Sequence, residues 1–159
     1  MKADKIYSSL LLALLLAGCA FAAVKPGMSQ PEVLAHYGKP TRVLPYGAGT
    51  RMQYSAQPAG QSVVNVDLDA AGKVVSTRQV MTFGELSKIE PGKWTRDDVE
   101  REFGRPASID HVASWSGDIM AYRWSDKLQD MFFWVYLDAD QRVQRTGQGM
   151  ELRIDMQER

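Results

Sequence analysis

The stretch MSQPEVLAHYGKP, at residues 28–40, decides how this chain folds, because its pattern returns as WTRDDVEREFGRP at residues 94–106. The two copies align without a gap, and Ser29 of the first corresponds to Thr95 of the second. Both residues are of the kind that caps the first turn of a helix with a side-chain oxygen. A repeat of this kind predicts that one structural unit occurs twice in the chain.

Each copy contains the features that begin and end a helix. Glu32 and Asp98 stand three residues after Ser29 and Thr95, which is the spacing of a capping box. The Gly-x-Pro sequence that closes each copy favours a positive φ and then prevents the helix from continuing. Helices of about two turns are marginal in water, so each must be held by packing on something else. The residues predicted to be buried are Val33, Leu34 and Tyr37 in the first helix and Val99 and Phe103 in the second.

Alternating apolar and polar residues after each helix predict strands. In the first copy they occur at residues 41–44, 51–55 and 62–68, with a returning strand at 73–81, and residues 82–89 predict a short helical bridge. In the second copy they occur at 107–114, 119–125 and 131–137, and a last strand is predicted to continue toward Met156 with a bulge at Gly147 or Gly149. The predicted fold class is α+β, with two tandem repeats, each a short helix or helix pair packed on a three-stranded antiparallel meander.

The N-terminal stretch, residues 1–18, predicts a lipoprotein signal peptide. Lys2 and Lys5 precede a run of apolar residues that is too short to cross about 30 Å of hydrocarbon. The run ends in Leu16-Ala17-Gly18-Cys19, which resembles the bacterial lipobox, and this resemblance implies that Cys19 is acylated and begins the mature chain. The residue after Cys19 is alanine, which by resemblance to lipoproteins of Gram-negative bacteria favours the periplasmic face of the outer membrane. Ordinary cleavage after residues 20–22 is the alternative, and it would give a soluble periplasmic protein.

Composition argues against several classes of function. The chain has 19 basic and 19 acidic residues in 159, with no basic stripe that would indicate a nucleic-acid binder. The two histidines, His36 and His111, have no cysteine beside them, since Cys19 is the only cysteine. No zinc spacing, phosphate loop or nucleophile elbow occurs. We therefore expect no enzyme activity, no cofactor, no metal and no small-molecule substrate.

The pattern Gly27-Met28-Ser29, then Val33, then Gly38-Lys39-Pro40, resembles the SmpA/OmlA (BamE-like) domain. The second copy departs from it, with Lys93-Trp94 where Gly-Met would stand. The family is similar in fold to the β-lactamase inhibitor proteins, which carry two such units in tandem. The resemblance implies BamE-like repeats at residues 19–81 and 82–159. It also implies a small outer-membrane lipoprotein that serves the machinery inserting β-barrel proteins.

A candidate partner-binding surface comes from comparing equivalent strands. Val63, Asn65 and Asp67 on one face of a first-copy strand correspond to Phe132, Trp134 and Tyr136 in the second copy. One face of an antiparallel sheet is often solvated, so the largely polar residues of the first copy can face water. The three aromatic residues of the second copy would form an exposed apolar patch, which we expect to be covered. The cover is either another part of this chain or a protein partner. Arg123, one strand over, is a candidate neighbour of Trp134.

Two hypotheses of function follow. The first is a lipid-anchored periplasmic protein-binding module that supports outer-membrane protein assembly or envelope integrity, with the β-barrel assembly machinery as a candidate partner. The second is a membrane-tethered inhibitor of an envelope enzyme, which requires a surface loop that enters an active site. The candidate loops are Tyr46–Thr50 and Trp115–Asp118.

Overall fold

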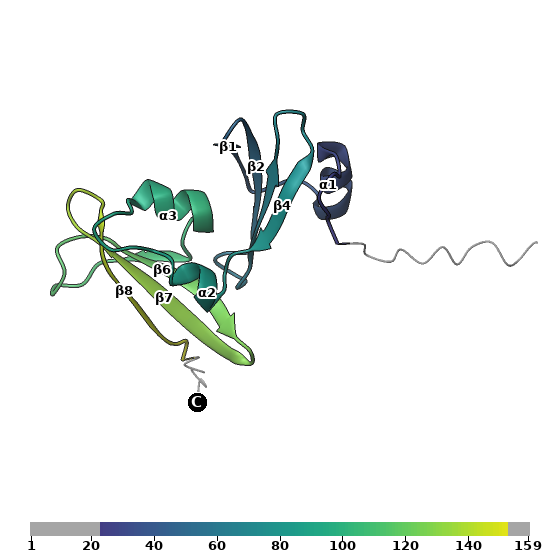
Figure 1. The fold of residues 1–159 in the computed structure, drawn as a ribbon. Helices are drawn as coiled ribbons and strands as arrows, with labels where there is room; N and C mark the ends of the chain where they lie inside the picture. The colour runs from purple at the N-terminus through teal and green to yellow at the C-terminus, as the bar shows by residue number, and fades with distance from the viewer. Residues whose placement is uncertain (1–22, 153–159) are drawn as a thin grey trace, which may run out of the picture.

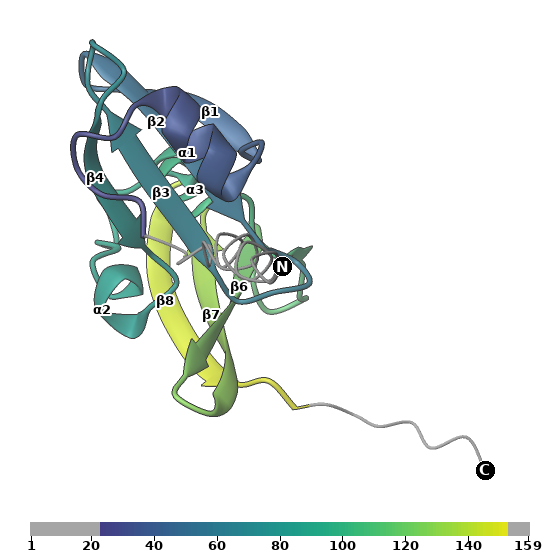
Figure 2. The same ribbon diagram turned by 90° about the vertical axis from the view of Figure 1, so that its right-hand side faces the viewer.

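A computed structural model describes residues 23–152, so the predicted signal peptide, the lipidation site Cys19 and the predicted strand residues Ile154 and Met156 lie outside the described residues. The described chain is α+β and forms two four-stranded antiparallel sheets with short helices (Figures 1 and 2). Along the chain, the last strand of the first sheet ends at Gln79, and the first helix of the second half begins at Phe83.

Sheet 1 has the order β1-β2-β3-β4, and sheet 2 has the order β5-β6-β7-β8. The elements of the first repeat are α1 (Gln30–Tyr37), β1 (Arg42–Tyr46), β2 (Gly49–Ser55), β3 (Val63–Leu68) and β4 (Val74–Gln79). Those of the second are α2 (Phe83–Leu86), α3 (Arg96–Phe103), β5 (Ser108–Asp110), β6 (Ile119–Asp126), β7 (Gln129–Leu137) and β8 (Val143–Met150).

The prediction of a three-stranded meander in each repeat is wrong, because all four strands of each copy are paired, including the edge strands that correspond to the predicted runs at residues 41–44 and 107–114. β1 pairs with β2 along its whole length, and the shorter β5 pairs with β6. Pro45 lies within β1 and weakens its strand pattern in the sequence. Proline is tolerated there because an edge strand needs hydrogen bonds on one side only.

The last two strands of each sheet have the same register, including a β-bulge at the equivalent position. In sheet 1, Leu68 pairs with Val74 and Asp67 with Ser76, which leaves Val75 as an extra residue. In sheet 2, the same shift leaves Gln144 as the extra residue, between the partners of Leu137 and Tyr136. The bulge of the last strand is therefore at Gln144 and not at either glycine that the sequence suggested.

The helices begin at the predicted capping boxes. The carboxylate of Glu32 accepts a hydrogen bond from the N–H of Ser29 at 2.7 Å, and that of Asp98 accepts one from the N–H of Thr95 at 2.9 Å. Hydrogen bonds from the side chain and backbone of Ser29 lower the pKa of Glu32, and those from the backbone and side chain of Thr95 lower the pKa of Asp98. Both helices end at glycines with positive φ, 73° at Gly38 and 76° at Gly104.

Two hydrophobic cores hold these elements, and the second is the larger. Val33 of α1 is buried in the first core, and Val99 and Phe103 of α3 are buried in the second, as predicted. Leu34 and Tyr37, in contrast, are 39% and 38% exposed. A two-turn helix reaches the sheet with a narrow stripe, so these neighbours lie at its flank, where Tyr37 packs against Tyr54 at 5.1 Å between ring centroids.

The repeats pack through α3. Figure 1 shows α1 on one side of sheet 1 and α3 on the other, so sheet 1 lies between a helix of its own repeat and a helix of the next. Val63 and Val80, from the first repeat, belong to the same core as α3. This arrangement places the C-terminal end of α3 on the face of sheet 1 that is turned away from α1.

Candidate functional site

The three aromatic residues singled out in the sequence lie on one face of β7. Alternation along the strand turns Phe133 and Val135 into the core, and Phe132, Trp134 and Tyr136 to the other side, where all three are half-buried. We call this side the outer face of sheet 2. α2 and α3 contribute to the core on the opposite side, and α1 packs on sheet 1.

Trp134 lies across the neighbouring strand β8, where two glycines make room for its ring. Gly147 is directly opposite Trp134, and Gly149 is opposite Phe132. A Cβ atom at Gly149 would lie only 2.9 Å from Cη2 of Trp134, whereas one at Gly147 would meet the nearest ring atoms at 3.8 to 3.9 Å. The Phe132 and Trp134 rings stack with centroids 6.0 Å apart. Together the two rings form a continuous aromatic layer over the backbone of β8, where the two glycines have no side chains.

The Tyr136 end of this face is covered by the chain itself. Trp115 packs edge-on against Tyr136 with centroids 5.3 Å apart, and its indole N–H donates to the carbonyl oxygen of Leu137 at 2.8 Å. The Arg145 guanidinium lies 3.8 Å from the Tyr136 ring centroid, a cation–π contact. The expectation of a cover is thus met within the chain at Tyr136, and the part of this face that remains centres on Phe132 and Trp134.

Arg123 has a different role from the one its sequence position suggested. It pairs with Phe132 across β6 and β7, so it is diagonal to Trp134 and not beside it. Its guanidinium donates to Glu151 at 2.8 Å and to the carbonyl oxygens of Pro58 and Ala59, both at 2.9 Å. Arg123 therefore binds the β2–β3 loop of the first repeat to sheet 2 through its Nε and Nη1 groups.

The equivalent face of sheet 1 has the opposite chemistry. The strand registers match Asn65 with Trp134, Asp67 with Tyr136 and Arg78 with Gly147. The sequence suggested a solvated polar face, and this is wrong, because α3 covers it. The buried polar residues are Arg51, Gln53, Asn65 and Asp67, each 1% exposed or less.

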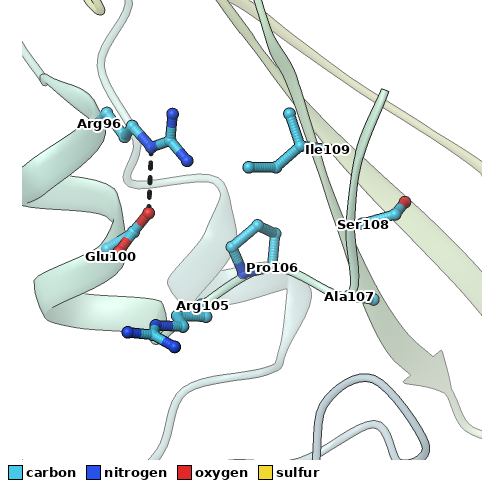
Figure 3. Close-up of a pocket in the computed structure, with 7 residues that line it drawn as sticks. All are labelled: Arg96, Glu100, Arg105, Pro106, Ala107, Ser108 and Ile109. Carbon is cyan, nitrogen blue, oxygen red and sulfur yellow. Dashed lines mark hydrogen bonds and ion pairs between the residues drawn. The ribbon is translucent and has the colours of Figure 1, made fainter. Parts of the chain in front are cut away.

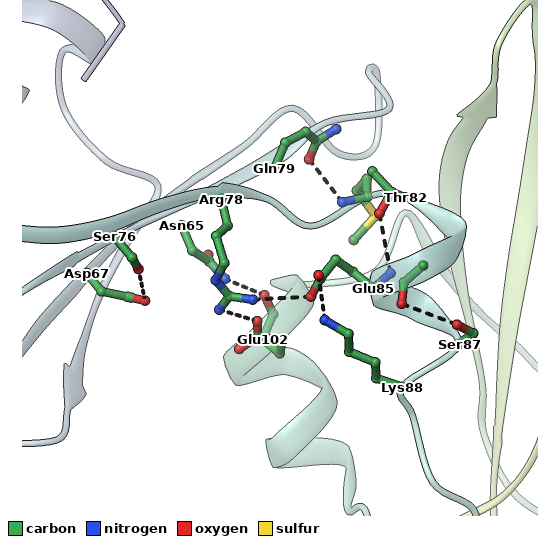
Figure 4. A network of polar contacts seen from close by, with 12 residues as sticks. Asn65, Asp67, Ser76, Arg78, Gln79, Thr82, Glu85, Ser87, Lys88 and Glu102 are labelled. Atoms are coloured by element: carbon green, nitrogen blue, oxygen red, sulfur yellow. Dashed lines mark hydrogen bonds and ion pairs between the residues drawn. The ribbon is translucent and has the colours of Figure 1, made fainter. Parts of the chain in front are cut away.

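Polar side chains of sheet 1 bind the last turn of α3, directly or, for Asp67, through Arg51. We call these residues the polar socket: Arg42, Arg51, Gln53, Asn65, Asp67 and Arg78. The side-chain amide of Asn65 donates to the carbonyl oxygen of Glu102 at 2.8 Å, and Arg42 donates to that of Glu100 at 3.0 Å. Carbonyl groups at the end of a helix lack partners within the helix, so the socket satisfies them from another repeat. The contacts of Asn65 and of Arg78 with Glu102 can be followed in Figure 4.

Ion pairs complete the polar socket. Arg51 binds Asp67 at 2.6 Å and Glu102 at 2.5 Å, and Arg78 binds the other oxygen of Glu102 at 2.7 Å. Burial disfavours the charged form of Arg51, but hydrogen bonds to Asp67 and Glu102 outweigh it and raise the pKa of Arg51. Every charge in the cluster is paired, as buried charges must be.

A groove lies between α3 and β5 (Figure 3), with a volume of about 600 Å³. Arg96 forms one wall and is paired with Glu100 at 3.1 Å and Asp118 at 2.9 Å. Pro106 and Ile109 form the opposite wall. Within residues 23–152, no cluster of three or more potential metal ligands occurs, and no helix is long and apolar enough to cross a bilayer.

No protein-family model matches the chain, and no curated protein matches it. Among solved structures, it is similar to a DUF4309 family protein from Bacillus subtilis, with 14% identity, a TM-score of 0.33, and coverage of 77% of this chain and 78% of that one. It is also similar to a “putative beta-lactamase inhibitor protein” from Streptococcus mutans, with 13% identity, a TM-score of 0.32, and coverage of 82% and 88%. Similarities at this level assign neither a family nor a function to this chain.

Proposed function

We propose that this chain is a lipid-anchored protein-binding module on the periplasmic face of the bacterial outer membrane, where it supports outer-membrane protein assembly or envelope integrity. One observation carries the binding role. At the position where sheet 1 buries a polar face against α3, sheet 2 has Phe132 and Trp134 half-buried over two glycines. Aromatic residues of this kind are favoured anchors of protein interfaces.

The location and the family are proposed from the sequence. Leu16-Ala17-Gly18-Cys19 supports acylation at Cys19, and two or more acyl chains anchor a protein stably. The capping box at Ser29, the positive φ of Gly38 and the repetition of both features in the second half support two BamE-like repeats. In this proposal, the lipid anchor joins the first repeat and the aromatic surface belongs to the second.

The binding role is tested by photo-cross-linking in intact envelopes. A photoreactive amino acid replaces Trp134, and the matched control replaces Val75, an exposed residue of β4. We expect capture of a component of the β-barrel assembly machinery or of a barrel protein from position 134 and not from position 75. Equal capture from both positions, or capture only of this chain, would remove the binding role.

The anchor is tested separately by membrane fractionation. Cys19→Ala should release the protein from the outer-membrane fraction and abolish labelling with a radioactive fatty acid. If the variant stays membrane-bound, the lipid-anchor proposal is wrong.

A second candidate function is a tethered inhibitor of an envelope enzyme, and one observation favours the β1–β2 turn as its contact. Tyr46 at this turn is exposed, and the Arg51 guanidinium lies 4.2 Å from its ring centroid, which holds the ring in place. The other candidate loop is less suited, because Trp115 is packed into its own repeat. Purified protein at about 10 μM, tested against periplasmic hydrolases and compared with Tyr46→Ala, decides this. The absence of any Tyr46-dependent inhibition would exclude the candidate.

A further inference from the structure

β8 is the last strand of sheet 2, so one of its edges has no neighbouring strand within residues 23–152. The direction of its backbone groups follows from β7. The N–H of Leu137 donates to Asp118, next to β6, at 2.9 Å. Trp134, three residues earlier, therefore directs its backbone groups the other way, toward Gly147 of β8. Gly147 and every second residue after it face β7, and the residues between them face outward: Thr146, Gln148 and Met150.

Only the beginning of this edge is occupied. The carbonyl oxygen of Val143 accepts from Gly92 at 2.7 Å, and its N–H donates to Trp94 at 2.9 Å. After the bulge at Gln144, the outward N–H and C=O groups of residues 146–150 have no hydrogen-bond partner in the described part of the chain. A row of such groups is a template for another strand.

Natural proteins protect sheet edges with short strands, prolines or charges. β5, the opposite edge of sheet 2, is protected in this way, because it has three residues. The edge of β8 reads Thr146-Gly147-Gln148-Gly149-Met150, which contains neither proline nor a charged residue. An unprotected edge of this length indicates a partner that is itself a strand.

The glycines determine which side chains such a strand would carry. Residues directly opposite each other on paired strands have Cβ atoms about 4.5 to 5.5 Å apart. Gly147 and Gly149 place no side chain on the outer face, and the Trp134 ring extends over them. A strand added beside β8 would therefore pack every second side chain against Trp134, and would turn the others toward the polar side chains of Thr146 and Gln148.

We propose that the outer edge of β8 and the Trp134 ring form a binding site for an extended peptide strand of alternating apolar and polar residues. Backbone hydrogen bonds to residues 146–150 provide the pairing, and Trp134 selects the apolar positions, which is the mode of recognition called β-augmentation. Strands of membrane-spanning barrels have this alternation. The inference rests on the proposed protein-binding role of sheet 2 and names the partner as an unfolded barrel strand.

Binding is measured by fluorescence anisotropy with the full-length lipidated protein in detergent micelles. The probe is a labelled peptide of 11 residues that alternates valine and threonine, with a lysine at each end. One control peptide has the same composition in scrambled order. Two others carry N-methyl groups on alternate backbone amides, one for each edge of the strand. We expect the alternating peptide to bind, the scrambled peptide to bind at least about tenfold more weakly, and one of the two methylated peptides to lose binding.

Two substitutions at one position test the edge itself. Gln148→Pro removes an outward N–H, which an edge strand tolerates, and should weaken peptide binding at least about tenfold. Gln148→Thr keeps the N–H and should leave binding within about twofold. Thermal unfolding of both variants verifies that sheet 2 is intact. Trp134→Ala should reduce the preference for the alternating peptide over the scrambled one.

Equal binding of the alternating and both methylated peptides would overturn the proposal, as would the absence of binding up to about 1 mM peptide. The same holds if Gln148→Pro binds as well as Gln148→Thr. Cross-linking from position 134 to a folded envelope protein, together with no peptide binding, would overturn this inference and leave the proposed function standing.

Discussion

The outer faces of the two sheets occupy equivalent positions and have opposite chemistry. Asn65 and Asp67 of sheet 1 are buried beneath α3, where Asn65 binds a carbonyl oxygen of its last turn and Asp67 binds Arg51. Their counterparts Trp134 and Tyr136 lie half-buried on a face that no described helix covers. One copy of the repeat thus uses this face to join the two halves of the chain, whereas in the other copy no described helix covers it.

The difference also explains why the polar face tolerates burial. Most buried polar groups of sheet 1 have a specific partner, such as Asp67 for Arg51 and the Glu102 carbonyl for Asn65, and the exceptions are the side-chain oxygens of Gln53 and Thr77. A buried polar group without a partner costs more than its hydrogen bond contributes. Substitutions on the two faces should therefore differ in their effect on stability.

The largest expected effect is at Asp67. Asp67→Ala leaves Arg51 with Glu102 as its remaining carboxylate, in a nearly fully buried position. Breaking a buried ion pair from one side costs about 3–5 kcal/mol, so urea unfolding should show a loss of this size. Asp126→Ala, at an exposed site in sheet 2, is the control and should change the unfolding free energy by less than about 0.5 kcal/mol. A loss below about 1 kcal/mol at Asp67 would show that the polar socket is not essential to the fold.

A smaller effect is expected at Asn65. Asn65→Ala removes the hydrogen bond to the Glu102 carbonyl oxygen and should cost about 1–3 kcal/mol. Amide hydrogen exchange then locates the loss, because the last turn of α3 should become less protected than its first turn. Val64→Ala, on the other face of the same strand, is a matched control for strand stability. Uniform loss of protection along α3 would contradict the assignment of Asn65 to the helix end.

The two glycines of β8 should differ from each other. Gly149→Ala places a Cβ 2.9 Å from the Trp134 ring and should cost about 1–2 kcal/mol, with a shift of the Trp134 indole resonance. Gly147→Ala meets only ordinary contacts at 3.8 to 3.9 Å, so it should be neutral or stabilising by less than about 1 kcal/mol. Chemical denaturation and indole NMR measure both effects. Equal responses at the two positions would mean that Trp134 does not lie across Gly149.

The smallest effect concerns the first turn of α3. Hydrogen bonds from Thr95 lower the pKa of Asp98 in the folded protein below its ordinary value of 3.8. The resulting stabilisation is present above the unfolded pKa and is lost as the pH falls through the folded pKa. The side chain of Asp98 is 43% exposed, so the contribution should stay below about 1 kcal/mol. Asp98→Asn should flatten the fall in stability below about pH 4. An acid profile identical to that of the unsubstituted protein would refute this.

The sequence predicted the features that depend on neighbouring residues. The helix starts at Ser29 and Thr95, the glycine ends and the buried positions Val33, Val99 and Phe103 follow from local spacing, and the structure confirms them. The sequence also indicated Trp134 as part of a candidate partner-binding surface.

What the sequence could not provide depends on how the two repeats meet. Asn65 and Asp67 have the alternation of a solvated strand face, and no local pattern shows that a helix 37 residues further along covers Asn65. The role of Arg123 was missed for the same reason, because its carbonyl partners Pro58 and Ala59 belong to the other repeat. Glycine is the usual local indication of a bulge, which favours Gly147 or Gly149 in the sequence, but the strand register places the bulge at Gln144.

Residues of both repeats complete the ends of α3, which affects how the protein can be divided. Its first turn is completed by Asp98 and Thr95 of its own repeat, and its last turn by Arg42, Arg51 and Asn65 of the other. A tandem duplication is commonly regarded as two interchangeable parts. Here a cut between residues 79 and 83 would separate a helix from the residues that finish it. The two repeats therefore have the same form, but they are not exchangeable modules. Either repeat transferred alone to another protein would lack the contacts that the other repeat provides at α3.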